Sequence, residues 1–307
     1  MDIKKYFSIL LLLFLIGLKP AYANAILTTN NFETVVQKVL QLIQRYGKDQ
    51  VLLVLDNDNT LTTMPQYLGS VVWLDWQFQL LKATPDNAYL VGRDTQQLLA
   101  AQRLLFRTSK MQLTEPRLDL LIKKIQDTGI HVIVLTARSP VLSNITQIQF
   151  KQNNLQFLTS ALTPKKGFAG TYLPYEKNNL AAYGVTKQQA KQLRLPKPRP
   201  VRYENGVFYA SDQNKGIMLE TLLHKTKHHF KAIIFIDDRL YNVEAMYNVF
   251  KNKPVDIVVY RYTRLDKFNK DFSQAEKLKT YKQWQKLQKT LERVFKLPQS
   301  LPKTAVA

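Results

Sequence analysis

The chain has 307 residues, 45% of them hydrophobic, so it is long enough and apolar enough to bury a sizeable core. This composition excludes a disordered or low-complexity protein, and the absence of cysteine excludes disulfides, thiolate metal sites and cysteine nucleophiles. Lysine and arginine number 44 against 23 aspartate and glutamate residues, a formal charge of +21. Such an excess suits polyanionic partners, anionic membranes or phosphorylated substrates, but it does not indicate a fold.

Residues 1–25 have the pattern of a secretory signal peptide. Lys4 and Lys5 precede an uncharged apolar run, and the small residues that follow it predict cleavage after Ala23 or Ala25. The run is shorter than the ~20 apolar residues of a membrane span, which disfavours an uncleaved anchor. We therefore expect an exported protein, periplasmic or secreted, with no stable membrane span after cleavage. Removal of three lysines and one aspartate with the signal lowers the charge from +21 to +19.

The remaining chain, residues 26–307, alternates helical patterns with continuous apolar runs. The apolar runs, which predict strands buried on both faces, lie at residues 51–56, 131–135, 232–236 and 256–260. Amphipathic helical patterns lie at residues 32–46, 117–128, 215–229 and 240–251. This alternation predicts an α/β protein, a three-layer Rossmann-like sandwich with a central parallel sheet.

Two long stretches interrupt the alternation and are candidate cap insertions, because insertions after strands of such a sheet lie over its ligand-binding carboxyl edge. Residues 62–116 are expected to be mainly helical. Residues 140–212 contain a predicted hairpin around Asn205 and Gly206, a pair that suits a type I′ turn. Residues 273–297 are expected to form an amphipathic helix that packs on the domain and exposes a basic face.

Carboxylates follow two of the predicted strands. Asp56 and Asp58 come at the end of the first strand, and Asp237 and Asp238 at the end of a later one. If these strand ends converge, up to four carboxylates share one cleft, which requires a cation. Oxygen-only ligands around a small site favour Mg²⁺.

Two further polar residues lie where they can serve such a site. Thr136 ends the second predicted strand, and Lys215 begins a predicted helix. A carboxylate beside Mg²⁺ is a nucleophile, and a phosphoryl group is its natural electrophile. Thr136 and Lys215 would then bind the remaining phosphoryl oxygens.

The order of these motifs resembles a known superfamily. VLLVLDNDNT, VIVLT, a lysine and IIFIDD resemble the four motifs of the haloacid dehalogenase (HAD) superfamily, over residues 51–262. Five further segments resemble the bacterial HAD-like family catalogued as domain of unknown function 2608. They are LGSVVW at 68–73, TEP at 114–116, LTAR at 135–138, ENGVFYASDQNKG at 204–216 and FIDD at 235–238.

The superfamily resemblance implies a Mg²⁺-dependent phosphatase that acts through an aspartyl-phosphate. It makes Asp56 the nucleophile and a Mg²⁺ ligand. It makes Asp58 the general acid/base, with its main-chain carbonyl on Mg²⁺, and an aspartate at this position implies a phosphatase.

The resemblance also assigns the remaining polar groups. Thr136 and Lys215 match the phosphate-binding positions, and Asp238 is the stronger candidate for direct Mg²⁺ binding, with Asp237 supporting it. The expected partner is a phosphorylated small molecule or macromolecule, which the sequence does not identify further.

Two alternatives remain at this stage. One is a non-catalytic HAD-fold protein that binds phosphorylated or polyanionic partners, which the intact motifs argue against. The other is a phosphatase for nucleic-acid ends, which is less favoured because the basic residues are spread along the whole chain.

Several other chemically capable residues have a simpler structural interpretation. We expect Arg138 and Arg239 to lie at the surface and Trp73 and Trp76 to pack in the interior. The histidines of the segment HKTKHHFK have no carboxylate among them, and we expect a solvated helix end there rather than a metal site. They are His224, His228 and His229.

Overall fold

The structure is a computed structural model, and it describes residues 24–295. The predicted signal peptide lies outside the described residues except for its last two positions, and so do the last two positions of the predicted helix at 273–297. Among the described residues, no helix combines the length and the apolar character needed to cross a membrane.

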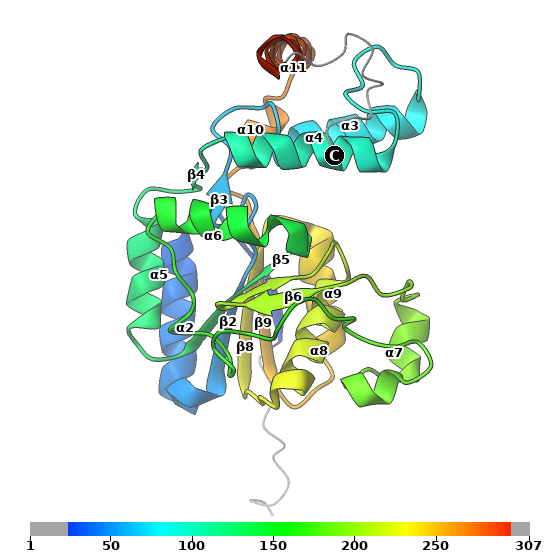
Figure 1. Cartoon of the computed structure of the whole chain (residues 1–307). Helices are drawn as coiled ribbons and strands as arrows, with labels where there is room; N and C mark the ends of the chain where they lie inside the picture. Colours follow the sequence, from blue (N-terminus) through cyan, green and yellow to red (C-terminus); the bar gives the residue numbers. More distant parts are fainter. Residues whose placement is uncertain (1–23, 296–307) are drawn as a thin grey trace, which may run out of the picture.

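A mostly parallel sheet forms the middle layer of the molecule (Figure 1). Within the described chain it has seven strands in the order β1-β9-β8-β2-β5-β7-β6, and only the β6–β7 pair is antiparallel. The strands are β1 (Ala25–Thr29), β2 (Val51–Leu55), β5 (His131–Thr136), β6 (Arg202–Glu204), β7 (Val207–Tyr209), β8 (Ala232–Asp237) and β9 (Asp256–Tyr262). All four predicted strands are present, and β2 lies at the centre between β5 and β8.

Helices cover both faces of this sheet, which confirms the predicted three-layer sandwich. One face is covered by α2 (Phe32–Tyr46) and α5 (Leu118–Gln126), and the other by α8 (Lys215–Thr226) and α9 (Leu240–Phe250). Strand β2 is apolar throughout because both of its faces are buried. Leu53 and Leu55 belong to the apolar cluster with α2, whereas Leu52 and Val54 belong to the cluster with α8 and α9. No face of this strand is left for polar side chains.

The segment 140–212, expected as a second cap, instead belongs to the sheet and its flanking layer. It contains η2 (Pro140–Leu142), α6 (Ser143–Gln152), η3 (Leu180–Tyr183), α7 (Lys187–Gln192) and the β6–β7 hairpin. Asn205 and Gly206 have φ of 50° and 78°, as the predicted type I′ turn requires. Strand β7 pairs with β5 and its three residues are fully buried, so the hairpin extends the central sheet.

The segment 62–116 lies beyond the carboxyl ends of the strands. It contains the short strands β3 (Thr62–Thr63) and β4 (Gln112–Leu113) and the helices α3 (Val71–Ala83) and α4 (Thr95–Thr108). Two helices that follow β9 lie next to this segment. They are α10 (Asp266–Lys270) and α11 (Gln274–Phe295). Figure 1 shows α3, α4 and α11 together, apart from the sheet, and we call these three helices the cap layer.

The cap layer has an apolar core of its own. Trp73 and Trp76 of α3, expected to pack in the interior, are buried there together with Leu105 of α4. Trp284 of α11 is buried in the same cluster. The C-terminal helix therefore packs on the cap layer and completes its core.

We predict that Trp284→Ala destabilises the protein by about 3–5 kcal/mol, because it leaves a cavity in the core of the cap layer. Urea denaturation followed by tryptophan fluorescence and far-UV circular dichroism measures the loss. Phe295→Ala on the same helix is the control, since Phe295 is 66% exposed and its removal should change stability little. Equal stability of Trp284→Ala and wild type would contradict the shared core.

Candidate active site

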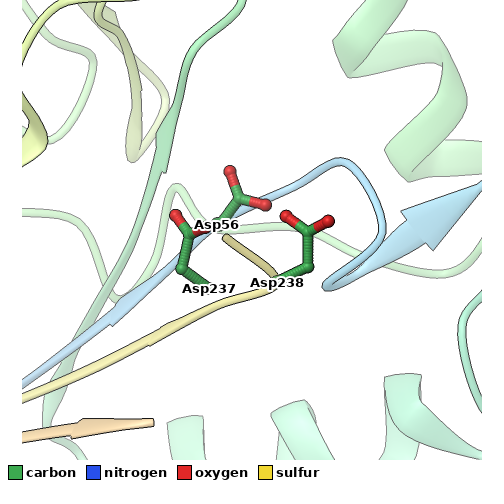
Figure 2. A group of neighbouring side chains, drawn as sticks. All are labelled: Asp56, Asp237 and Asp238. Atoms are coloured by element: carbon green, nitrogen blue, oxygen red, sulfur yellow. The ribbon is translucent and has the colours of Figure 1, made fainter. Parts of the chain in front are cut away.

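Three carboxylates meet at the carboxyl ends of the two central strands β2 and β8. Asp56 follows β2, Asp237 ends β8 and Asp238 comes next. The Asp56 N–H donates to the carbonyl of Ile236 over 2.9 Å, which continues the pairing of the strands into the site. Each residue offers a carboxylate oxygen, these oxygens lie within 4.8 Å of one another, and all three residues are buried (Figure 2).

Lys215 lies between two of these carboxylates. Its Nζ donates to Oδ1 of Asp56 and, over 2.6 Å, to Oδ2 of Asp237, and the residue is only 1% exposed. Lys215 is the first residue of α8, and Gly216 behind it allows this helix to approach α9 closely. A Cβ at position 216 would lie 2.5 Å from the carbonyl oxygen of Ala245. Lys215 is thus a buried counter-ion and not a solvated helix start.

The charges of this cluster do not balance. Burial is the main cause that raises the pKa of Asp56 to about 7, reinforced by Asp237 and Asp58 and opposed by Lys215. Burial, Asp237 and Asp56 likewise raise the pKa of Asp238. The pKa of Lys215 is raised because its two carboxylate partners outweigh its burial. Lys215 and the partly exposed Arg239 face these three carboxylates, and Arg239 is shared with Asp75. A bound divalent cation would therefore favour the ionised forms of the cluster.

Asp237 and Asp238 differ in how many of their carboxylate oxygens accept hydrogen bonds. Both oxygens of Asp237 are engaged, since Oδ2 accepts from Lys215 while Oδ1 accepts from the N–H of Arg239 (2.8 Å) and from Asn242 (3.1 Å). Asp238 is contacted at Oδ2 alone, and among the described residues no donor reaches its Oδ1. Asp238 is therefore the better placed of the two for direct metal binding.

The polypeptide after β2 holds Asp238 in place. Asn59 donates from Nδ2 to Oδ2 of Asp238 over 3.3 Å, and the hydroxyl of Thr60 accepts from its N–H over 3.1 Å. Asn59 has φ of 63°, a left-handed conformation that asparagine tolerates better than most residues. Thr114, in the TEP segment, donates to the carbonyl of Thr60 over 2.6 Å. The sequence motif around Asp56 thus also supports the carboxylate that comes from β8.

Asp58 does not join the three clustered carboxylates. Its oxygens accept two parallel hydrogen bonds from Arg138, from Nε over 2.9 Å and from Nη2 over 2.7 Å. The expectation that Arg138 lies at the surface is wrong, because the residue is only 5% exposed. The position of Asp58 two residues after Asp56 predicts that both face one cleft. It does not predict the pairing with Arg138, which lies 80 residues away along the chain.

Thr136 ends β5, the strand that neighbours β2, and is fully buried. Its hydroxyl oxygen accepts from the N–H of Arg138 over 3.1 Å. Among the described residues its hydroxyl donates to no protein group, so the hydrogen is available to a ligand. The sheet order therefore brings Thr136 to the same edge as the carboxylates, where a phosphate-binding hydroxyl is expected.

Residues beside the site connect it to neighbouring elements. Arg239 is partly exposed, and it pairs with Asp238 and, over 2.5 Å, with Asp75 of the cap-layer helix α3. Ser211 and Asp212, in the loop before Lys215, both have φ of 53°, a conformation that costs energy in non-glycine residues and is concentrated at functional sites. The loop belongs to the segment ENGVFYASDQNKG at 204–216, whereas no sequence motif indicated Asp75.

The histidine segment lies elsewhere, on the last turn of α8 and the loop after it. His224 and His229 are exposed, and the ring of His228 stacks on Phe230 with centroids 5.9 Å apart. Among the described residues, the acidic cluster of Asp56, Asp237 and Asp238 is the group with the spacing of metal ligands, and no histidine belongs to it.

Comparison with known protein families assigns the chain to one family. The model of a family described as protein of unknown function (DUF2608) matches residues 28–295. The chain belongs to this family. The matched residues include the site, the cap layer and all of the sheet except the first three residues of β1. A search of curated proteins found no match.

We predict that metal-free Asp56→Asn protein is more stable than wild type above pH 7 and loses this advantage toward pH 4. The pKa of Asp56 is raised from 3.8 to about 7, so in this interval the folded protein holds a proton that the unfolded chain has released. Wild-type stability therefore falls as the pH rises through the interval, and the amide removes this contribution. Urea denaturation in EDTA across this range tests it, with the exposed Asp49→Asn as control. A pH-independent difference would contradict the electrostatic explanation.

A second prediction concerns metal binding. Mg²⁺ at 100 times its Kd is expected to stabilise the wild-type protein by about 2.7 kcal/mol, seen as a rise in Tm. Asp238→Asn should weaken Mg²⁺ binding at least ~10-fold, because it removes a charged oxygen ligand. Asp127→Asn, which alters an exposed surface pair, should respond like wild type. The same rise in Asp238→Asn as in wild type would exclude Asp238 as a ligand.

Proposed function

We propose that this protein is an exported Mg²⁺-dependent phosphomonoesterase of the HAD type that acts through an aspartyl-phosphate on Asp56. The observation that supports it most is the cluster of three buried carboxylates around Lys215 at the carboxyl ends of β2 and β8. Hard divalent cations prefer such oxygen ligands, and this edge of an α/β sheet is where ligands bind. The N-terminal signal pattern supports export.

Bound Mg²⁺ would neutralise phosphoryl oxygens and so make the phosphorus atom a better electrophile. Asp56 suits the nucleophile because Lys215 fixes its Oδ1, whereas no described residue donates to Oδ2. In the proposed first step Oδ2 attacks phosphorus and the bond to the leaving oxygen breaks. That oxygen takes a proton from Asp58.

In the second step water attacks the phosphorus of the aspartyl-phosphate and gives its proton to Asp58. The bond between phosphorus and Asp56 then breaks and inorganic phosphate leaves. The hydroxyl of Thr136 and the ammonium of Lys215 bind phosphoryl oxygens in both steps, and burial strengthens these interactions. Asp237, with both oxygens engaged, orients Lys215.

We predict that the purified mature protein hydrolyses 4-nitrophenyl phosphate with Mg²⁺ and that EDTA abolishes the reaction. Asp56→Asn should lower kcat by on the order of 10³-fold or more while the protein stays folded, because the amide cannot form the phosphoenzyme. Asp127→Asn is the control with normal activity. Rapid acid quench of the wild type with a ³²P-labelled phosphomonoester should trap label on the protein, and Asp56→Asn should trap none.

Other results of these activity assays would exclude the mechanism or favour one of the alternative functions. Full activity in Asp56→Asn would exclude the mechanism. If the wild type turned over no member of a broad phosphomonoester panel, the chain would instead be a binding protein for phosphorylated or polyanionic partners. A marked preference for 3′- or 5′-phosphorylated oligonucleotides, with affinity that falls steeply with salt, would indicate the nucleic-acid-end phosphatase.

A further inference from the structure

We propose that Arg138 is the positioning residue for Asp58: it holds this carboxylate away from the metal-binding carboxylates and links its orientation to the cap layer. The inference rests on the proposed function, in which Asp58 protonates the leaving oxygen. It concerns a residue for which the motif pattern alone gives no role, and it depends on contacts among three separate segments of the chain.

The guanidinium group of Arg138 is fixed on several sides. Nε and Nη2 donate in parallel to the two oxygens of Asp58, while Nη1 donates to Thr146 (2.8 Å) and Gln149 (2.7 Å) of α6. The ring of Phe106 lies under the group, 4.3 Å from Cζ. A planar fork held in this way defines the plane and the direction of its carboxylate partner, which a lysine ammonium does not.

This arrangement divides the acidic groups of the site into two sets. Asp56 and Asp237 share Lys215, and Asp238 pairs with Arg239, whereas the cation that pairs with Asp58 is Arg138. Asp58 is only two residues after Asp56, and without a cation of its own it would be attracted to bound metal. Arg138 gives this carboxylate a separate counter-ion and fixes its direction.

The contacts of Arg138 continue into the cap layer. Gln149, which accepts from Arg138, donates from Nε2 to the carbonyl of Phe106 over 2.9 Å, and Phe106 belongs to α4. Phe106 is also buried in the core of the cap layer. A shift of α4 would therefore move two of the groups that hold Arg138, and Asp58 with them.

A purely structural Arg–Asp pair would affect stability alone, and the experiment separates the two roles by leaving-group chemistry. Phenyl phosphates with 4-nitro, 3-nitro, hydrogen and 4-methyl substituents have similar size but increasingly basic leaving oxygens. A poor leaving group needs the proton from Asp58 and a good one does not. The slope of log kcat/KM against leaving-group pKa therefore reports the position of Asp58.

We expect Arg138→Lys to lose about 10-fold in kcat/KM on 4-nitrophenyl phosphate and about 10²- to 10³-fold on phenyl phosphate, so that the slope steepens. Gln149→Leu, which does not contact Asp58, should steepen the slope less. Arg45→Lys is the matched control, because Arg45 pairs with the buried Asp256 at the opposite edge of the sheet. It should leave the slope unchanged even if Tm falls.

A double-mutant cycle completes the test. If Arg138 acts through Asp58, Arg138→Lys adds little further steepening in an Asp58→Asn background. A wild-type slope in folded Arg138→Lys and Gln149→Leu proteins, or full additivity with Asp58→Asn, would overturn the proposal. Should Arg138→Lys fail to fold, the slope of Gln149→Leu decides. Absence of hydrolysis in the wild type would instead count against the proposed function.

Discussion

The site depends on one electrostatic constraint, the burial of three carboxylates at a single edge of the sheet. Burial and neighbouring carboxylates raise the pKa values of Asp56 and Asp238, and Lys215 offsets only part of this cost. Much of the surrounding structure can be understood from this. Gly216 lets the helix of Lys215 pack closely against α9, and Asn59 holds Asp238. The remaining negative charge is what a divalent cation would neutralise.

A second group of interactions keeps the acid/base carboxylate of the proposed reaction apart from this cluster. Arg138 gives Asp58 its own counter-ion and connects it through Gln149 to α4. Arg239 makes a comparable connection from Asp238 to Asp75 of α3. Arg138 lies two residues after Thr136 and Arg239 directly follows Asp238, and both arginines contact the cap layer. The sheet and the cap layer are thus joined by charged groups at the site itself.

Local pattern was enough to predict the central part of the fold. The run VLLVL is apolar throughout because both faces of β2 are covered, and Asn205–Gly206 supplies the two positive φ angles of its turn. The hydrophobic pattern does not predict strand β1, since it is a short edge strand and partly exposed. The sequence pattern favours a cap at residues 140–212 because the three-residue strand β7 looks the same in sequence whether its hairpin is isolated or pairs with β5.

The sequence by itself determined which chemical groups follow which strands, because strand ends and helix starts are encoded by local hydrophobic periodicity. Asp56, Thr136, Lys215, Asp237 and Asp238 could be found in this way. Only the tertiary structure decided the pairing of the charges: Arg138 with Asp58, and Arg239 with both Asp238 and Asp75. A surface arginine and a buried one have the same local sequence signal. Their partners lie far away along the chain, and folding alone brings them within hydrogen-bonding distance.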